Sequence, residues 1–280
     1  MANPALCDYF GQDAAALANK KLFLFDVDGT LYTGDRVFAG TMETLAYIEK
    51  IKGRCVYITN NSSKSVQDHI AKMGRLGIRA TAENFFTSTQ AALLYLQKHY
   101  PGKTVYCMGT RSMVAELQSG GVAVTCRVGA APIVLVGFDT ELTGEKIENT
   151  CNMLTRDTIY LATNPDLCCP VEFGFIPDCG AICGLLACAT GRKPKYIGKP
   201  NPDMVYLLQQ KYGVSPEETV VVGDRLYTDI ATGNNAGVTS VCVLTGEATE
   251  QQILNSSGSQ RPTLTFKSIK EFAALLENTL

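Results

Sequence analysis

KLFLFDVDGT, residues 21–30, is the stretch that decides the fold. An apolar run that ends in aspartates and a glycine is typical of a strand in a parallel sheet whose carboxyl end opens on a binding crevice. Asp26 stands at that end, Asp28 can point into the same crevice, and Gly29 lets the chain turn sharply. Two carboxylates this close repel unless a divalent cation joins them, and one can act as nucleophile while the other transfers protons. The alternative is an aspartate pair that only caps a turn before a helix.

Further apolar, β-branched runs resemble this one. They are residues 54–59, 104–109, 133–138, 158–163, 219–224 and 240–246. Helical spacing of apolar residues lies between some of them, at Met42, Leu45 and Ile48 and at Val66, Ile70, Met73 and Leu76. Strands that alternate with helices predict an α/β fold with a doubly wound, mostly parallel, Rossmann-like sheet.

A second polar turn follows the run VYIT, where Thr59, Asn60 and Asn61 precede two serines. The Thr59 hydroxyl and the next backbone N–H groups can donate to phosphate oxygens. We expect a helix to begin near Ser63, and a helix N-terminus favours anions. The alternative is a plain strand-to-helix turn in which asparagine and serine act as caps.

Two later motifs supply the remaining groups of a phosphoryl-transfer site. Lys199 lies between a glycine and a proline, and its ammonium can hold a phosphoryl oxygen. Asp224 ends the run TVVVG, and with Asp26 it offers the oxygen ligands that magnesium prefers. Asp229 can bind the metal through water or position Lys199. The alternatives are a solvated surface lysine and, for Asp229, a helix N-cap.

At these residues the sequence resembles the haloacid dehalogenase (HAD) superfamily. DVDGT at 26–30 matches its nucleophile motif, Thr59-Asn60 its second motif, Lys199 its third and GDRLYTD at 223–229 its fourth. The second aspartate, Asp28, matches the phosphatases of the superfamily and not its dehalogenases.

The resemblance implies a role for each matched residue. Asp26 would be the nucleophile and Asp28 the general acid and base, while Thr59, Lys199 and neighbouring N–H groups stabilise the phosphoryl oxygens. Mg²⁺ would be held by Asp26, the backbone carbonyl of Asp28, Asp224 and water, with Asp229 beside it. The expected activity is hydrolysis of a small phosphorylated metabolite, such as a sugar phosphate or nucleotide monophosphate, through an aspartyl-phosphate.

The spacing of the motifs predicts an inserted domain. Residues 60–198 separate the second motif from the third, which is far more than one crossover needs. This resembles the NagD and 4-nitrophenylphosphatase branch, which implies a discontinuous core at 1–86 and 197–280 and an α/β cap domain at 87–196. The segment 162–182 resembles the branch's substrate-facing cap loop. Cys169 there would contact substrate in place of the histidine that some vitamin-phosphate phosphatases carry, which disfavours pyridoxal phosphate.

Composition excludes several other classes of protein. The 280-residue chain has a net charge of −2, so no basic surface predicts binding to nucleic acid or to a membrane. We expect no signal peptide and no membrane span. The 11 cysteines, with only His69 and His99 as histidines, predict reduced thiols and not a zinc site. A cytoplasmic enzyme is therefore expected, and the resemblance implies a homodimer formed through the caps.

Four alternatives to this function remain open. Within the same branch, the substrate could be phosphoglycolate or pyridoxal phosphate. A phosphomutase of the superfamily usually carries its cap between the first two motifs, which this spacing disfavours. A receiver-like phospho-sensing module is about half this length, and shared fold alone does not settle function. A non-catalytic binding protein on the same scaffold would not need acidic groups at every matching position.

Overall fold

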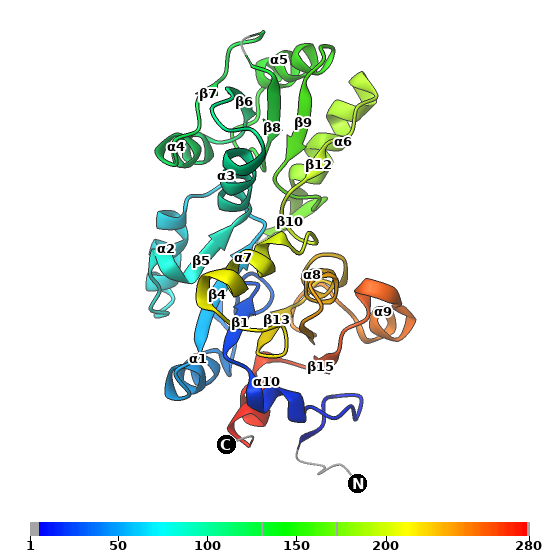
Figure 1. The fold of residues 1–280 in the computed structure, drawn as a ribbon. Coiled ribbons are helices and arrows are strands. Elements are labelled where there is room, and N and C mark those ends of the chain that lie inside the picture. Colours follow the sequence, from blue (N-terminus) through cyan, green and yellow to red (C-terminus); the bar gives the residue numbers. More distant parts are fainter. Residues whose placement is uncertain (1–5, 130, 172, 279–280) are drawn as a thin grey trace. The chain divides into compact units, whose positions relative to one another are not determined.

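The computed structural model describes residues 6–129, 131–171 and 173–278. They form two compact units, each built around its own sheet (Figure 1). Among the described residues, the first unit takes those of 1–58, 73–85 and 199–280, and the second takes those of 59–72 and 86–198.

A six-stranded sheet with the strand order β15-β14-β13-β1-β4-β5 lies mainly in the first unit, and Thr59 of β4 and residues 86–87 of β5 belong to the second. The strands of this sheet are β1 Leu22–Phe25, β4 Arg54–Thr59, β5 Phe85–Thr87, β13 Thr219–Gly223, β14 Thr239–Val243 and β15 Leu264–Phe266. Every neighbouring pair from β15 to β4 is parallel. Phe25, at the end of β1, is in register with Val222 of β13, so the residues that follow these two strands meet at one edge.

Burial on both faces explains why the central strands are continuously apolar. All four residues of β1 and all five of β13 are buried. The ring of Phe272 contacts Phe25 and Phe266, with ring centroids 6.4 and 5.5 Å apart. These contacts anchor the C-terminal helix on the sheet.

Helices and short turns complete the first unit. They are α1 Thr41–Lys50, α7 Asp203–Tyr212, α8 Ala231–Asn235, α9 Glu250–Asn255 and α10 Ile269–Glu277, the 3₁₀ turns η2 Ala15–Asn19, η3 Ala82–Asn84 and η5 Gly258–Gln260, and the π-helical turn η4 Leu226–Ile230. A small hairpin, β2 Tyr32–Thr33 with β3 Arg36–Val37, follows the first aspartate motif. Helix α2, Val66–Arg75, has residues in both units.

The second unit contains a five-stranded parallel sheet with the order β12-β9-β8-β6-β7. Its strands are β6 Val105–Met108, β7 Val124–Thr125, β8 Ile133–Val136, β9 Ile159–Ala162 and β12 Lys195–Tyr196, and its helices are α3 Ser88–His99, α4 Arg111–Ser119, α5 Gly144–Leu154 and α6 Cys179–Thr190. An antiparallel hairpin, β10 Cys168–Val171 with β11 Gly174–Pro177, precedes α6. The core of this unit packs β6, β8 and β9 against α5 and α6.

The predicted α/β fold is confirmed, and each predicted strand run overlaps a strand of the structure. The helix expected near Ser63 begins at Val66 instead, because Ser65 and Asp68 cap each other through their side chains and N–H groups. The helical spacing of Met42, Leu45 and Ile48 is confirmed by α1, in which Ile48 is buried and Met42 is 48% exposed. The domain boundaries at 86/87 and 196/197 stay a prediction.

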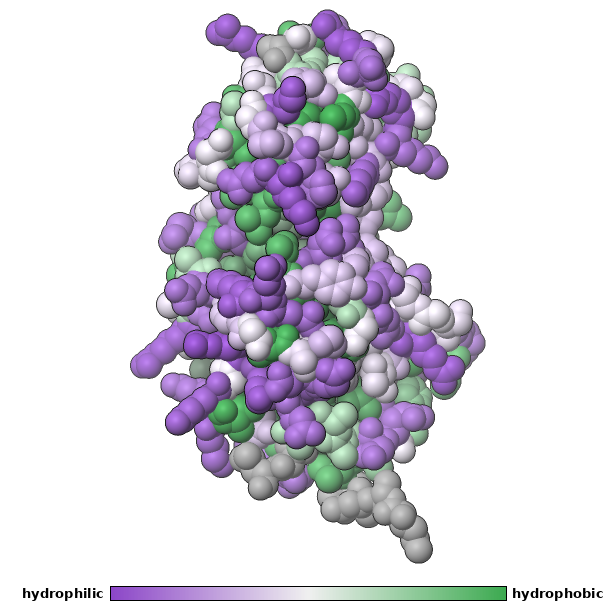
Figure 2. Space-filling view, in the orientation of Figure 1, coloured by the Kyte–Doolittle hydropathy of each residue, from purple (hydrophilic) through white to green (hydrophobic). Residues whose placement is uncertain are grey.

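The surface and the helices give two further observations. On the face drawn in Figure 2, hydrophilic residues predominate and apolar residues occur in small groups between them. None of the helices in the described ranges combines the length and apolarity that a membrane span requires.

Candidate active site

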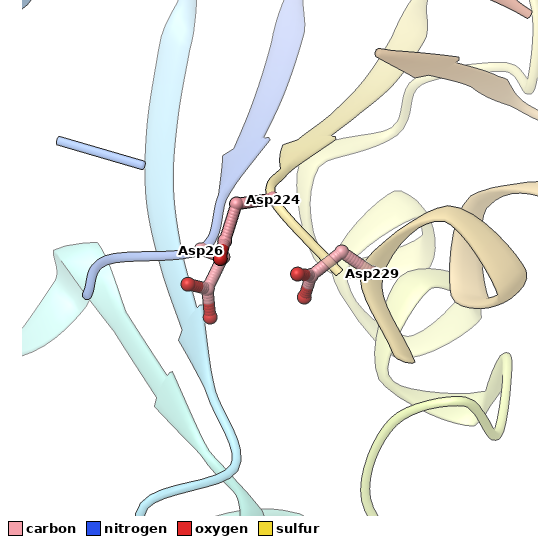
Figure 3. A group of neighbouring side chains, drawn as sticks. All are labelled: Asp26, Asp224 and Asp229. Atoms are coloured by element: carbon pink, nitrogen blue, oxygen red, sulfur yellow. The ribbon is translucent and has the colours of Figure 1, made fainter. Parts of the chain in front are cut away.

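Three aspartates converge at the carboxyl edge of the first sheet. Asp26 follows β1, Asp224 follows β13, and Asp229 lies in the turn η4 (Figure 3). One carboxylate oxygen of each lies within 4.8 Å of the other two. The Asp26 N–H donates to the Val222 carbonyl over 2.8 Å, so pairing of the two strands itself brings Asp26 beside Asp224.

Lys199 binds two of these carboxylates. Its Nζ lies 2.6 Å from Asp26 Oδ1 and 2.6 Å from Asp229 Oδ1, and it donates to the Ile58 carbonyl over 3.1 Å. The Lys199 side chain is 2% exposed, so it is not a solvated surface lysine. The ammonium therefore fixes the orientation of Asp26 and neutralises part of the acidic cluster.

Asp229 is held from two sides. Its Oδ1 accepts from Lys199, and its Oδ2 accepts from the backbone N–H of Arg225 over 3.1 Å. The Asp229 side chain is fully buried. It is not an N-cap, because it lies inside η4, and its contacts suit a group that positions Lys199.

A loop after β14 encloses Asp224. The Glu247 N–H donates to Asp224 Oδ2 over 2.8 Å, and the Thr30 hydroxyl donates to Oδ1 over 3.3 Å. A Cβ on Gly29, which has a φ of +90°, would come within 2.6 Å of Asp224 Oδ2, and a Cβ on Gly246 would overlap the same oxygen. The chain therefore needs glycine at both positions to approach the carboxylate.

The electrostatics of the cluster follow from burial and crowding. Burial, followed by the neighbouring Asp229, raises the pKa of Asp224 to about 7. Burial raises the pKa of Asp26 well above its usual range; Asp229 and Asp224 add to this rise and Lys199 opposes it. Burial alone would lower the pKa of Lys199, but Asp229 and Asp26 together hold it above its ordinary value. The site thus holds more negative charge than a single ammonium balances.

This donor set fits a hard divalent cation. Buried carboxylates that repel one another are stabilised when such a cation binds them, and carboxylate oxygens are the ligands that Mg²⁺ prefers. Within the described part of the chain, the three aspartates are the one group of this kind. The Asp28 carboxylate does not belong to it.

Asp28 lies on the turn that leaves β1. It bridges to Tyr32, and the Gly29 N–H donates to the Tyr32 carbonyl over 2.8 Å. Burial raises the pKa of Tyr32, and the charges of Asp28 and Asp26 raise it further. Both carboxylates therefore lie close enough to the Tyr32 phenol to raise its pKa. Asp28 is thus near Asp26, although it does not belong to the cluster of three aspartates.

The polar turn after β4 is hydrogen bonded both within itself and to Asp166. Thr59 Oγ1 accepts from the Asn61 N–H over 3.1 Å, which leaves the Thr59 hydroxyl proton for another acceptor. Asn61 Oδ1 accepts from the N–H and the hydroxyl of Ser63 over 3.0 and 2.7 Å. Asn60 Nδ2 donates to Asp166 Oδ2 over 2.6 Å. The side chains of both asparagines thus serve to shape the turn.

Cys169 lies on β10, where it is half-buried and packs against the core of the second unit. All 11 cysteines carry free thiols. Cys179 and Cys183, one helical turn apart on α6, are buried in the same core. The described cysteines form no metal-binding group.

The sequence interpretation missed the groups that surround Asp224. Thr30, Thr245 and Glu247 hold this part of the site, and the Thr245 hydroxyl donates to the Gly29 carbonyl over 2.6 Å. A signal existed in the sequence, because Thr245-Gly246 follows an apolar run at the same edge of the sheet.

Two family models match the chain. A model described as haloacid dehalogenase-like hydrolase matches residues 23–123, and one described as HAD-hydrolase-like matches residues 196–272. The acid sugar phosphatase of Staphylococcus saprophyticus is 31% identical over 261 residues, which cover 93% of this chain and 100% of the relative. The enzyme of the same description from Staphylococcus aureus strain MRSA252 is 32% identical over 258 residues, 92% of this chain and 98% of the relative.

Solved structures with the same fold include several phosphatases. The 4-nitrophenylphosphatase of Thermotoga maritima has a TM-score of 0.87 and 34% identity, and the match covers 92% of this chain and 98% of that one. NagD of Escherichia coli K-12 has a TM-score of 0.81 and 30% identity, with 90% and 98% covered. The glycerol phosphate phosphatase of Mycobacterium tuberculosis, solved in complex with magnesium, has a TM-score of 0.85 and 28% identity, with 91% and 77% covered.

Proposed function

The chain belongs to the haloacid dehalogenase-like hydrolases, and on this premise we propose that it is a magnesium-dependent phosphatase whose nucleophile is Asp26. It is a phosphoric monoester hydrolase that acts on small phosphate esters. The observation that carries the proposal is the cluster of Asp26, Asp224 and Asp229 around the buried ammonium of Lys199.

In the first half of the reaction, an Asp26 oxygen attacks the phosphorus of the ester. The bond from phosphorus to the ester oxygen breaks, and Asp28 protonates the departing oxygen. Lys199 holds Asp26 by its Oδ1 and so limits the rotation of the attacking carboxylate. The product of this half is an aspartyl-phosphate at residue 26.

In the second half, water attacks the phosphorus of the aspartyl-phosphate. Asp28 accepts a proton from that water, and the bond between phosphorus and the Asp26 oxygen breaks. Inorganic phosphate and the free carboxylate are released. Thr59, the N–H groups of its turn and Lys199 bind the phosphoryl oxygens, both in the bound ester and during transfer.

Asp26, Asp224 and the backbone carbonyl of Asp28 would hold the Mg²⁺ ion, and Asp229 would reach it through water. When bound, the ion supplies positive charge that neutralises the phosphate. A relative solved with magnesium supports this choice of metal.

We infer that residues 87–196 act as a cap domain on a core of residues 1–86 and 197–280. The second unit has a parallel sheet of its own, which supports its assignment as a separate α/β cap domain. The curated relatives are described as acid sugar phosphatases, so a sugar phosphate is the substrate class we favour. The contact with substrate expected of Cys169 receives no support from its packing against the core.

The decisive experiment compares the wild type with Asp26→Asn on 4-nitrophenyl phosphate, with Mg²⁺ and after its removal by EDTA. We expect wild-type turnover that requires the metal and no turnover by the variant. Phosphate that stays on the denatured wild-type protein after a quenched reaction would support the aspartyl-phosphate. Full activity of a correctly folded Asp26→Asn variant would refute the assignment of the nucleophile.

A further inference from the structure

Asn60, in the turn proposed to bind phosphate, is held from two sides by residues distant in sequence. Its Nδ2 donates to Asp166 Oδ2 over 2.6 Å, and its backbone carbonyl accepts from the Ser88 hydroxyl over 2.8 Å. Asn60 is 7% exposed, Asp166 2% and Ser88 fully buried. A buried bond to a charged acceptor is stronger than a neutral one, so the Asp166 contact fixes the direction of the Asn60 side chain.

Asp166 is itself anchored to the start of α6. Asn164 Nδ2 donates both to Asp166 Oδ2, over 2.9 Å, and to Asp178 Oδ1, over 3.0 Å. Asp178 is the N-cap of α6, and the Gly180 N–H donates to the Asp166 carbonyl over 2.8 Å. Asn164 is fully buried and Asp178 is 5% exposed. This gives a continuous buried hydrogen-bond chain from the N-terminus of α6 to Asn60.

We propose that Asp166 is a positioning residue for the phosphate-binding turn Thr59–Asn61. Its carboxylate holds Asn60 in place and thereby orients the Thr59 hydroxyl and the N–H groups beside it. The proposal rests on the proposed function, since that function assigns phosphate binding to this turn. A role confined to the stability of the second unit would not require a direct bond to the residue next to Thr59.

The alternative is that Asp166 only stabilises its own unit, and the two roles predict different kinetics. A positioning residue for the phosphate group acts on the ground state and the transition state alike, so its loss raises KM and leaves kcat nearly unchanged. We expect Asp166→Ala to raise both KM for 4-nitrophenyl phosphate and the dissociation constant of inorganic phosphate about tenfold, with kcat changed by less than about threefold. Asp166→Asn retains one acceptor oxygen and should raise both constants by a smaller factor.

A double-mutant cycle tests whether Asp166 acts through Asn60. We expect Asn60→Ala to weaken phosphate binding to a similar degree, and Asp166→Ala to have no further effect when it is added to Asn60→Ala. Asp139→Asn is the matched control. Asp139 is a fully buried carboxylate of the same unit that pairs with Lys146 at 2.7 Å, and it is not bonded to the turn. This control should lower the thermal midpoint without changing KM or phosphate affinity.

Phosphate binding is measured by calorimetry with Mg²⁺ present, so this result does not depend on turnover. If the wild type shows no phosphatase activity, the proposed function fails, and the effect of Asp166→Ala on phosphate affinity still decides the present proposal. Unchanged KM and phosphate affinity in folded Asp166→Ala would overturn it, as would fully additive effects in the cycle. Should Asp166→Ala not fold, Asp166→Asn decides the question, and phosphate affinity equal to that of Asp139→Asn would overturn the proposal.

Discussion

Replacing Lys199 with methionine should strongly destabilise the metal-free protein. The Lys199 ammonium lies 2.6 Å from one oxygen each of Asp26 and Asp229, and its side chain is 2% exposed. Methionine keeps much of the length of the side chain and removes its charge. The carboxylates would then remain buried beside one another without the cation that now separates them.

The magnitude follows from the geometry. At an effective dielectric constant of about 20, each 2.6 Å contact contributes roughly 6 kcal/mol of Coulomb attraction. Desolvation of the buried charges cancels most of this gain, and removal of one partner from such a pair typically costs about 3–5 kcal/mol. The pKa of Lys199 is raised in the folded state, so its contribution is fully present at neutral pH and is lost only in strongly alkaline solution. We therefore expect Lys199→Met to lower the free energy of unfolding by about 3–5 kcal/mol.

The assay is urea unfolding followed by circular dichroism at neutral pH in EDTA. Lys21→Met is the control, because Lys21 pairs with Glu218 at 2.5 Å in the same unit but its side chain is 66% exposed. A surface pair of this kind contributes little to stability, because water and salt screen it. Mg²⁺ should restore part of the stability of Lys199→Met, since a ligand at about a hundredfold its dissociation constant adds about 2.7 kcal/mol.

Two results would refute this reasoning. If Lys199→Met and Lys21→Met were equally stable in EDTA, the buried ammonium would not be needed to hold the carboxylates together. If Mg²⁺ stabilised the wild type and failed to stabilise Lys199→Met, the added ion would not replace the lost charge.

Three further predictions follow from the same structure. Gly246→Ala should displace the Asp224 carboxylate, so the Mg²⁺ concentration for half-maximal phosphatase activity rises about tenfold or more, the equivalent of about 1.4 kcal/mol. Asp28→Asn should slow both formation and breakdown of the aspartyl-phosphate by about 10²- to 10⁴-fold, measured by rapid-quench release of the alcohol from an alkyl phosphate, whose leaving oxygen needs a proton, and by steady-state turnover. Burial, with Asp68 nearby, raises the pKa of Glu116 to about 7, so its contribution to stability is complete below the ordinary value of 4.5 and is lost as the pH rises to 7. Glu116→Gln should therefore match the wild type in acid and exceed its free energy of unfolding by about 1–2 kcal/mol above pH 7, because this carboxyl is partly exposed and solvent screens much of the effect.

Each of these predictions has its own control or contrary result. Gly74→Ala adds a Cβ that meets no atom within 4 Å and should leave the metal requirement unchanged. An unchanged first phase in Asp28→Asn would show that another group protonates the leaving oxygen. Stability curves of Glu116→Gln and wild type that run parallel from acid to alkaline pH would contradict the raised pKa of this carboxyl.

The fold was largely predictable because its strands are local features of the sequence. Buried parallel strands require continuous apolar runs, and Asp26 and Asp224 are each fixed by the strand directly before them. The burial of Lys199 could not be predicted in the same way, because most lysines lie on the surface. Lys199 is buried only because the carboxylates of Asp26 and Asp229 pair with it.

Contacts between distant residues were the part that the sequence did not predict. Glu247 reaches Asp224, and Asn60 reaches Asp166, only after the chain has folded. Periodicity and turn signals describe neighbours along the chain, and neither contact leaves a local pattern. The helix start at Val66 was missed for a smaller reason, because the reciprocal caps of Ser65 and Asp68 compete with an earlier start.

The place of β1 between β4 and β13 has a consequence for synthesis on the ribosome. Residues 22–25 leave the ribosome well before residues 219–223, which form one of their two hydrogen-bonding neighbours. Until that segment leaves the exit tunnel, one edge of this apolar strand has no partner within the chain. Strands of other chains can pair with such an open edge. The sheet of the second unit lies wholly within residues 105–196. It can therefore form before β13, β14 and β15 of the first sheet have been synthesised.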